Sequence, residues 1–231
     1  SPSASSPLVS TAGPFTFRLC PSDLAYGAAL ARFASDKGIR RAAVLYVNDA
    51  YGRGVRETFA AEFSQLGGEV VELDPFLAES PDVGVYLARM AREKKVQAIV
   101  LAANQDEGLK VLGQIRDAKL ALPILGGDGM AGAERTSPAM MEGVFVSSGY
   151  LVGNPAPLNR TFVAAYEKMF PRAGPPDQGA AAAYDAVKLL ARVIEKTGTD
   201  RNAVREGLSH VGQGDPAYDG VVGRVAFDSL G

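Results

Sequence analysis

A short apolar run, Arg41–Val47, is followed directly by a polar turn that contains glycine. A run this short and apolar is typical of a strand buried on both faces of a parallel sheet. The turn, Asn48-Asp49-Ala50-Tyr51-Gly52-Arg53-Gly54, leads into an amphipathic pattern that predicts a helix over Val55–Leu66. This order of strand, turn and helix places Tyr51 at the carboxyl edge of a sheet, where open α/β sheets bind ligands.

Two later segments repeat this order. Val96–Ala103 runs into the polar residues Asn104-Gln105-Asp106-Glu107, and Pro123–Gly127 runs into Asp128-Gly129. Because parallel strands end at a common edge, polar side chains from three strand ends should meet there. The sequence therefore predicts a binding cleft at that edge.

Alternating strand and helix patterns over the first two thirds of the chain predict an α/β fold with a doubly wound parallel sheet and helices on both faces. The expected strands are Phe15–Leu19, Ala42–Val47, Glu69–Leu73, Val96–Leu101, Pro123–Leu125, Val144–Tyr150 and Val225–Phe227. The expected helices are Leu24–Lys37, Val55–Leu66, Val83–Lys95, Gly108–Ala118, Leu158–Phe170, Gln178–Thr197 and Ala203–Val211. Residues 1–14 are rich in Ser, Pro and Gly and predict a loop.

The helix pattern at Gln178–Ile194 is apolar on several sides. A helix of this kind needs a partner surface, which most of this chain does not supply. We therefore expect both ends of the chain to lie inside a larger protein.

The charge pattern argues against nucleic acid as a partner. The formal net charge is −2, and Lys and Arg are scattered along the chain. Nucleic-acid and anionic-membrane binding both need basic clusters. No apolar run approaches the roughly 20 residues that span a bilayer, and no signal peptide is present, so an exported form has lost its targeting segment. The single cysteine, Cys20, excludes an internal disulfide and a cysteine-based metal site.

The motif inventory favours binding over catalysis. The sequence contains no HExxH, phosphate loop, GxSxG or Cys–His pairing. His210 is the only histidine and is expected at a helix surface. Gly52-Arg53-Gly54 fails as a dinucleotide fingerprint because Glu57 stands where the third glycine belongs. We expect no enzymatic activity, catalytic residue, cofactor or metal.

Each candidate residue has a structural alternative. Tyr51 either faces a ligand or packs over the first turn of its helix, and Asn104 either donates to a ligand or caps the next helix. Asp128 either belongs to a simple Asp-Gly turn or pairs with a cationic group. The segment Ser1–Ser6 either holds a carboxylate through its hydroxyl and N–H groups or is a disordered terminus.

The order of these features resembles that of type I periplasmic solute-binding proteins, in particular the leucine/isoleucine/valine-binding family of ABC importers. The resemblance rests on Phe17-Arg18 before Pro21-Ser22-Asp23, on Asn48–Gly54, on Gly126-Gly127-Asp128-Gly129 with Gly143-Val144, on Ala183-Tyr184-Asp185-Ala186, and on Gly220, Gly223 and Phe227-Asp228. It covers essentially the whole chain.

The resemblance implies two Rossmann-like lobes joined by crossover segments. Residues 1–19 would form a loop and a crossover strand of the first lobe, residues 20–146 a nearly complete second lobe, and residues 147–231 an incomplete C-terminal part of the first lobe. The opening strands and helices of the first lobe are absent from this sequence.

The resemblance also assigns ligand-binding roles. Ser3, through its backbone, and Ser5, through its hydroxyl and N–H, would hold the α-carboxylate of an amino acid. Tyr51 would close over the ligand, and Asp128 would take its α-ammonium group. Asn104 stands where the family often has an aromatic residue. A zwitterion that leaves water needs both of its charges matched.

These expectations describe an extracytoplasmic protein, periplasmic or extracellular and either soluble or lipid-anchored. It would capture an amino acid or close analogue by hinge closure of its two lobes and deliver it to a membrane ABC permease. Two alternatives stay open: a clamshell sensor of amino acids or amides that signals to a partner protein, and an enzyme built on a doubly wound sheet.

Overall fold

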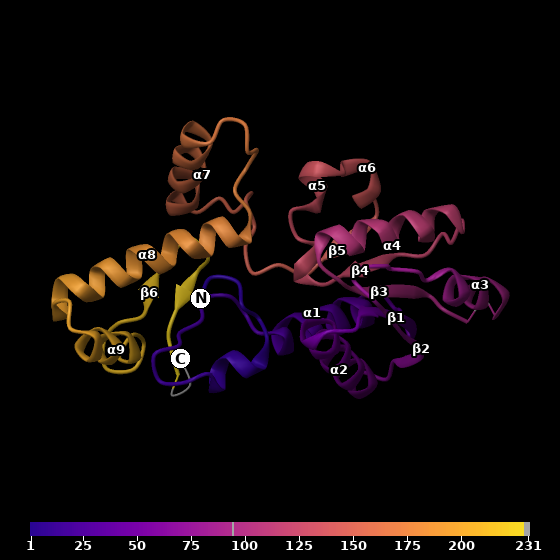
Figure 1. The fold of residues 1–231 in the computed structure, drawn as a ribbon, viewed down its shortest axis with the longest axis horizontal. Helices are drawn as coiled ribbons and strands as arrows, with labels where there is room; N and C mark the ends of the chain where they lie inside the picture. The colour runs from indigo at the N-terminus through magenta and orange to yellow at the C-terminus, as the bar shows by residue number, and fades with distance from the viewer. Residues whose placement is uncertain (94, 229–231) are drawn as a thin grey trace. The chain divides into compact units, whose positions relative to one another are not determined.

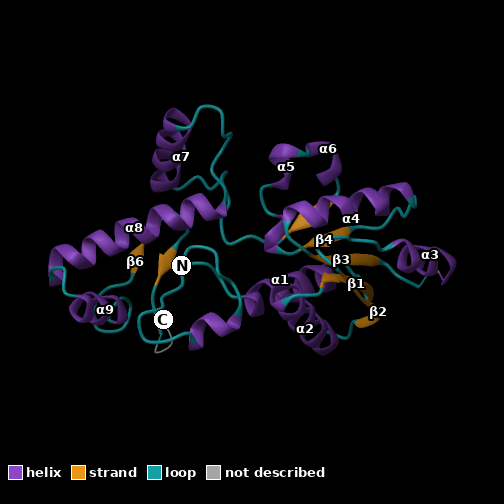
Figure 2. Ribbon diagram, in the orientation of Figure 1, coloured by secondary structure: helices purple, strands orange, loops and turns teal. Residues whose placement is uncertain are grey.

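The computed structural model describes residues 1–93 and 95–228 (Figures 1 and 2). The chain divides into two compact units. One, which we call the sheet unit, is Ser22–Ser148; the other, which we call the helical unit, comprises Ser1–Pro21 and the residues from Gly149 on. The chain therefore passes between the units twice.

The sheet unit contains a five-stranded sheet of order β2-β1-β3-β4-β5 in which every neighbouring pair is parallel. Its strands are β1 (Arg41–Val47), β2 (Glu69–Phe76), β3 (Ala98–Ala102), β4 (Ile124–Gly126) and β5 (Val144–Val146). Its helices are α1 (Asp23–Asp36), α2 (Ala50–Gln65), α3 (Gly84–Glu93), α4 (Gln105–Asp117), η2 (Asp128–Met130), α5 (Ala133–Thr136) and α6 (Pro138–Met141). The predicted doubly wound parallel sheet is confirmed.

Side chains of β1 alternate between two cores, one on each face of the sheet. Ala42, Val44 and Tyr46 pack with residues of α1 and α2. Ala43, Leu45 and Val47 pack with residues of α3 and α4 on the opposite face (Figure 1). Burial on both faces explains why the run reads as continuously apolar in the sequence. In this strand order the direction of winding reverses between β1 and β3, and ligands of open α/β sheets bind at that point.

The helical unit is built around α8 (Gln178–Thr197), with η1 (Pro7–Thr11), α7 (Pro157–Met169), α9 (Arg201–Ser209) and a small hairpin of β6 (Tyr218–Asp219) and β7 (Arg224–Val225). Leu189 and Val193 of α8 pack with Val211, Val225 and Phe227. A second small core joins Tyr150, Phe162, Ala181 and Val221.

The buried Asp185 ties α8 to the hairpin loop. Its Oδ1 accepts the N–H of Val221 at 2.9 Å, and its Oδ2 accepts that of Val222 at 2.8 Å. A Cβ at Gly220 would lie 2.4 Å from Oδ2, so this position requires glycine. The motif Ala183-Tyr184-Asp185-Ala186 and Gly220 thus belong to one structural contact.

Several predicted elements differ in the structure. Phe15–Leu19 is not a strand: Phe17 packs edge-on against Phe227, with ring centroids 5.0 Å apart, and the N–H of Leu19 bonds the carbonyl of Ser1 at 3.0 Å. The apolar residues of the pattern, Phe17 and Leu19, are half-buried against the core of the helical unit, without a ladder of strand hydrogen bonds. Residues 7–11, predicted as loop, form the 3₁₀ helix η1.

Other boundaries shift. Helix α2 begins at Ala50 and α4 at Gln105, earlier than predicted, whereas β5 ends at Val146 and β7 at Val225. The predicted helix over Val83–Lys95 corresponds to α3, and residue 94 lies outside the described residues. Strand β6 and the short helices η2, α5 and α6 were not predicted because elements of two to four residues carry no periodic signal. Within the described residues, no helix combines the length and apolarity needed to cross a membrane.

Candidate functional site

Tyr51 lies in the first turn of α2, immediately after the carboxyl end of β1. Asp49 caps this helix, and its Oδ1 accepts the N–H of Gly52 at 2.8 Å. A Cβ at Gly52 would lie 2.0 Å from the carbonyl oxygen of Val47, so the tight passage from strand to helix requires glycine there. This turn holds Tyr51 at the rim of the sheet.

Tyr51 and Asp128 are in direct contact. The phenol O–H donates to Oδ1 of Asp128 at 3.0 Å, and the phenol oxygen accepts the N–H of Gly129 at 2.8 Å. Asp128 follows β4, so residues 77 positions apart meet at the same edge of the sheet. The predicted convergence of the β1 and β4 ends is observed.

The glycines beside Asp128 allow this close approach. A Cβ at Gly127 would lie 2.5 Å from the Tyr51 phenol oxygen, and one at Gly129 would lie 2.7 Å from the carbonyl oxygen of Ala103. The backbone of Gly127 is extended, with φ −65° and ψ 169°, so lack of space, rather than a left-handed conformation, requires glycine there. The Gly-Gly-Asp-Gly motif is therefore a packing requirement of the Tyr51–Asp128 contact.

The environment of the pair opposes negative charge. Burial raises the pKa of the Asp128 carboxyl to about 6; the hydrogen bond from Tyr51 works against this shift, and the charge of Asp23 adds to it. Burial, followed by the charge of Asp128, raises the pKa of the Tyr51 phenol well above its usual value. A cationic group next to Asp128 would relieve this cost.

Asn104 lies at the third strand end, where it caps α4. Oε1 of the buried Glu107 accepts the backbone N–H of Asn104 at 2.8 Å and its side-chain amide at 2.9 Å. Oδ1 of Asn104 faces Gly129, at 3.0 Å from the position of a Cβ there. The capping alternative therefore describes what Asn104 does in this structure, and its contact with a ligand stays a prediction.

Ser3 and Ser5 belong to the helical unit, so the structure does not bring them together with Tyr51, Asn104 and Asp128 in one unit. Ser5 is buried and Ser3 is exposed. Hydrogen bonds organise the surrounding segment: the terminal ammonium of Ser1 donates to the carbonyl of Phe17 at 2.6 Å, and Arg18 donates to that of Ser6 at 3.1 Å. Carboxylate binding by Ser3 and Ser5 stays a prediction.

Asp23 is a site residue that the sequence analysis missed. Its side chain is fully buried at the start of α1, and a Cβ at Gly54 would lie 3.0 Å from its Oδ2. Its charge acts on both Asp128 and Tyr51. In the sequence, Asp23 reads as an ordinary acidic residue in the first turn of a helix, where it interacts favourably with the helix dipole. The one sequence feature that could have indicated its position is Gly54, three residues after Tyr51, because a glycine there allows a close approach by another side chain.

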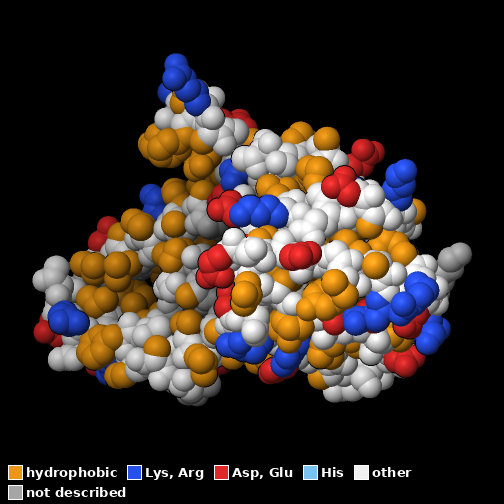
Figure 3. Space-filling model, turned by 45° about the vertical axis from the view of Figure 1, so that its right-hand side comes forward, with side chains coloured by type: hydrophobic (Ala, Val, Ile, Leu, Met, Phe, Trp, Pro, Cys, Tyr) orange, Lys and Arg blue, Asp and Glu red, His pale blue; other side chains and the backbone are white. Residues whose placement is uncertain are grey.

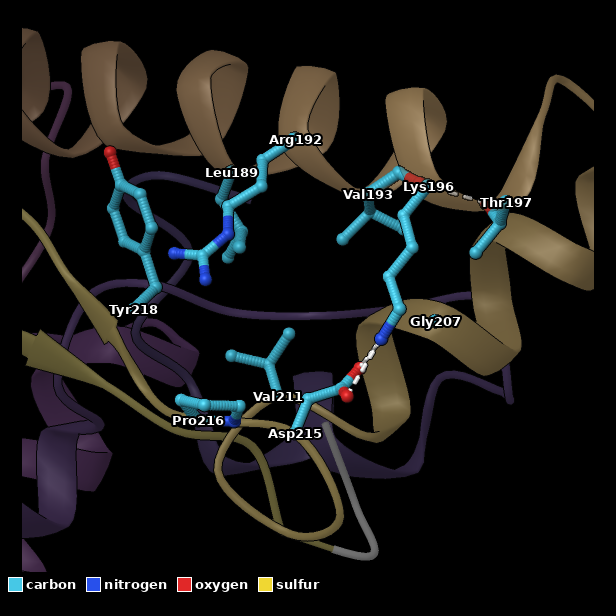
Figure 4. Close-up of a pocket in the computed structure, with 10 residues that line it drawn as sticks. All are labelled: Leu189, Arg192, Val193, Lys196, Thr197, Gly207, Val211, Asp215, Pro216 and Tyr218. Carbon is cyan, nitrogen blue, oxygen red and sulfur yellow. Dashed lines mark hydrogen bonds and ion pairs between the residues drawn. The ribbon is translucent and has the colours of Figure 1, made fainter.

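A cavity of about 80 Å³ lies between α8, α9 and the β6 hairpin. Figure 4 shows Arg192 descending from α8 toward Pro216 and Val211, while the Lys196 ammonium reaches Asp215 at 2.7 Å. The ion pair neutralises Lys196, one of the two cationic side chains that line the cavity; the other is Arg192. None of the predicted site residues lines the cavity. Within the described residues, no group of His, Cys, Asp and Glu is arranged to hold a metal.

One side of α8 is exposed and apolar. Tyr184, Val187 and Leu190 are 36, 68 and 41 % exposed, and Figure 3 shows hydrophobic side chains gathered over this part of the helical unit. The opposite side of α8 is covered, because Leu189 and Val193 pack against Val211, Val225 and Phe227. The helix therefore has the expected apolar partner on one side only. Cys20 is buried. His210 is exposed at the end of α9, as predicted.

A model of the periplasmic binding protein family matches residues 1–229. The Leu/Ile/Val-binding protein homolog 6 of Brucella abortus is 27 % identical over 212 residues, which cover 84 % of this chain and 51 % of that protein. The chain thus spans about half the length of the curated relatives it matches.

Solved structures give the same result. One is the branched-chain amino acid binding protein LivJ of Streptococcus pneumoniae in complex with isoleucine, with a TM-score of 0.86 and 26 % identity. The alignment covers 99 % of this chain and 64 % of the LivJ chain. A solute-binding protein of R. palustris in complex with benzoate has a TM-score of 0.88 but 20 % identity, over 99 % of this chain and 63 % of its own, and this likeness shows the fold alone.

These matches confirm the resemblance to type I branched-chain amino acid binding proteins. They also confirm that the chain is not an enzyme, since its relatives and structural neighbours are solute-binding proteins. The family works outside the cytoplasm, binds small molecules and serves ABC transporters. This chain belongs to the periplasmic binding protein family.

Proposed function

We propose that this chain is part of an extracytoplasmic protein that captures an amino acid or close analogue and delivers it to a membrane ABC permease. The observation that carries the proposal is the Tyr51–Asp128 contact at the carboxyl edge of the sheet. It supplies an acidic group at the position where open α/β sheets bind ligands.

The charge of this site favours a ligand with an ammonium group. The Asp128 carboxylate is partly buried, and burial raises its pKa to about 6. An ammonium group supplies the opposite charge that a partly buried carboxylate lacks. A benzoate bound by its carboxylate at the same position would instead place two negative charges together. The relative in complex with isoleucine is therefore the better guide to the ligand than the relative in complex with benzoate.

The other end of the ligand is assigned to the Ser1–Ser6 segment. Ser3 would bind the α-carboxylate through its backbone, and Ser5 through its hydroxyl and N–H. Because these residues and Asp128 belong to different units of the chain, binding would require closure of the two units around the ligand. Tyr51 would cover the ligand from the α2 side, and Asn104 would contact it beside Gly129.

Calorimetric titration of the protein with leucine, isoleucine, valine, short-chain amides and benzoate tests the proposal. Asp128→Asn should weaken amino-acid binding by about 2–5 kcal/mol, because the ligand ammonium would lose its charged partner. The matched control is Asp106→Asn, which neutralises an exposed acid in the first turn of α4. Equal leucine affinity in the wild type and Asp128→Asn would refute the assignment, as would binding of benzoate alone.

Transport and sensing predict different gene neighbours. Permease and ATPase genes next to the gene for this chain would support delivery to a transporter. A kinase or antiterminator gene in their place would support the alternative, a clamshell sensor that signals to a partner protein.

A further inference from the structure

Glu107 lies in the first turn of α4 and is only 7 % exposed. Carboxyl side chains are almost never buried to this extent unless they are paired. The partner here is Asn104: Oε1 of Glu107 accepts its backbone N–H at 2.8 Å and its side-chain Nδ2–H at 2.9 Å. One oxygen of a buried side chain therefore holds both the backbone and the amide group of Asn104.

These two hydrogen bonds fix which way the Asn104 amide faces. Only the nitrogen of an amide can donate, so Nδ2 is the atom that faces Oε1 of Glu107, and Oδ1 lies on the other branch of the amide. A carbonyl oxygen has two lone pairs, so capping of α4 leaves Oδ1 able to accept a further donor. Asn104 is exposed, and a ligand can therefore reach this oxygen.

Oδ1 of Asn104 faces the loop that carries Asp128. Outside its chain neighbours, the three atoms nearest to a Cβ at Gly129 would all be oxygens. They are the carbonyl of Ala103 at 2.7 Å, and Oδ1 of Asn104 and the phenol oxygen of Tyr51 at 3.0 Å each. Since both lie 3.0 Å from the same point, the last two oxygens are at most about 6 Å apart. Oxygens that follow β1 and β3 thus gather at Gly129, the residue after Asp128.

A close packing contact holds α4 against this loop. Met130 is fully buried in η2, the 3₁₀ helix that begins at Asp128. A Cβ at Gly108 of α4 would lie 2.1 Å from Sδ of Met130, so the start of α4 can pack here only because this residue is glycine. The contact sets the position of Asn104 relative to Asp128.

The side chains around Gly129 present acceptors to a ligand. The proton of the Tyr51 phenol is already donated to Oδ1 of Asp128 at 3.0 Å, and the amide nitrogen of Asn104 is held at Glu107. A ligand that approaches Gly129 therefore meets carboxylate, carbonyl and phenol oxygens, which accept hydrogen bonds. Acceptors gathered in this way match a group that carries several N–H donors.

We propose that Glu107 is a positioning residue of the ligand site, which fixes Asn104 so that its Oδ1 accepts a second N–H of the ligand ammonium, the first being taken by Asp128. The arrangement selects primary ammonium compounds, which carry three N–H donors. A fully N-methylated ammonium carries the same charge and no N–H, and is excluded. This inference rests on the proposed function, which assigns the ligand ammonium to Asp128.

The ligand class is tested by calorimetric titration of the wild type with leucine, N-methylleucine and N,N,N-trimethylleucine, which share one side chain and one carboxylate. The trimethyl compound should bind at least about 100-fold more weakly than leucine, because it keeps the charge and has no N–H donor. N-methylleucine keeps two N–H donors, one for Asp128 and one for Asn104, and should bind within about tenfold of leucine.

The role of Glu107 is tested by a pair of variants. Glu107→Leu keeps a similar volume but removes the acceptor, so the Asn104 amide can turn and leucine should bind about 10- to 100-fold more weakly. Glu107→Gln keeps an oxygen that can accept both donors of Asn104 and should restore the affinity to within about threefold of the wild type. Asp106→Leu removes an exposed acid from the same turn of α4 and is the matched control, with unchanged affinity.

Asn104→Ser tests the other partner. Serine keeps a capping hydroxyl for α4 but is too short to place an oxygen at Gly129, so leucine should again bind about 10- to 100-fold more weakly. Because Glu107 acts through Asn104, adding Glu107→Leu to Asn104→Ser should weaken leucine binding no further. Circular dichroism and thermal denaturation establish that each variant is folded.

Leucine affinity equal to that of the wild type in folded Asn104→Ser would overturn the inference, as would equally weak binding by Glu107→Gln and Glu107→Leu. Trimethylleucine that binds as tightly as leucine, or N-methylleucine that binds as weakly as trimethylleucine, would also overturn it. If Glu107→Leu does not fold, Asn104→Ser and the methylated ligands still decide the question. The proposed function fails by a different result, namely that leucine, isoleucine and valine do not bind the wild type.

Discussion

The phenol oxygen of Tyr51 donates its proton to Oδ1 of Asp128 and at the same time accepts the N–H of Gly129, the next residue. One hydroxyl thus binds the side chain of one residue and the backbone of its neighbour. The loop after β4 is held in place by a residue of α2, and the position of the acidic group depends on both.

Tyr51→Phe should destabilise the protein by about 1–2 kcal/mol, because it removes a donor to Asp128 and an acceptor for Gly129. It should also raise the pKa of Asp128 further, since the Tyr51 hydrogen bond lowers it. Urea denaturation measures the first effect, and carboxyl NMR the second. Tyr86→Phe is the control: its hydroxyl donates to the carbonyl of Pro75 at 3.1 Å near the surface, and the pKa of Asp128 should not respond.

Asp128→Asn should stabilise the ligand-free protein at alkaline pH. The folded-state pKa is raised from 3.8 to about 6, so between these values the native state holds a proton that the unfolded chain has released. The free energy of unfolding of the wild type therefore falls as the pH rises from 4 to 6, by about 2–3 kcal/mol. The variant lacks this fall and should be the more stable protein by about 1–3 kcal/mol at pH 8.

Denaturation of both proteins at pH 4, 6 and 8 checks this. At pH 4 the advantage of the variant should be much smaller than at pH 8. A constant difference across the three values would show that Asp128 does not titrate as the structure indicates.

Gly129→Ala should cost about 1–3 kcal/mol, because the added methyl group would lie 2.7 Å from a backbone oxygen that cannot move aside. It should also break the contact between Tyr51 and the loop. Thermal denaturation gives the stability, and the NMR signals of the loop amides report the contact. Gly153→Ala is the matched control, since no atom lies within 4 Å of the new methyl group; a similar loss there would contradict the steric explanation.

Asp185→Asn should destabilise the helical unit by about 2–3 kcal/mol. The amide nitrogen would face a backbone N–H where a carboxylate oxygen now accepts the N–H of Val221 or Val222. Amide hydrogen exchange at Val221 and Val222 should accelerate, while exchange in β1 of the sheet unit stays close to that of the wild type. The exposed Asp219→Asn tests whether removal of any nearby charge has the same effect; we expect none.

The sheet could be predicted because a strand that is buried on both faces, such as β1, consists almost entirely of apolar residues. The sequence pattern misplaced the start of α2 by five residues for a physical reason. Gly52 and Gly54 lower helix propensity, so the pattern suggested a helix from Val55. Both glycines are required by close approaches, of the Val47 carbonyl and of Asp23, and these tertiary contacts outweigh propensity.

The site was predictable where it follows strand ends. Tyr51 and Asp128 were placed at one edge by the order of strands and turns, and they meet there. Asp23 was not predictable in the same way, because its role depends on how α1 packs against α2. Asn104 was predicted both as a cap and as a ligand contact, and the structure contains the cap. The roles of Ser3 and Ser5 stay predictions, since a strand-end argument says nothing about residues outside the sheet.

The backbone of the sheet, together with the Tyr51 side chain, fixes the position of Asp128. The N–H of Gly127 bonds the carbonyl of Leu101, and the N–H of Ser147 bonds that of Gly126, so the ladder continues to the residue before Asp128. Because backbone hydrogen bonds hold the strand ends, side chains at this edge of the sheet can be exchanged without repacking of the core. Under the proposed function, substitutions at the ends of β1, β3 and β4 are therefore the first ones to test when the ligand preference of this chain is to be changed.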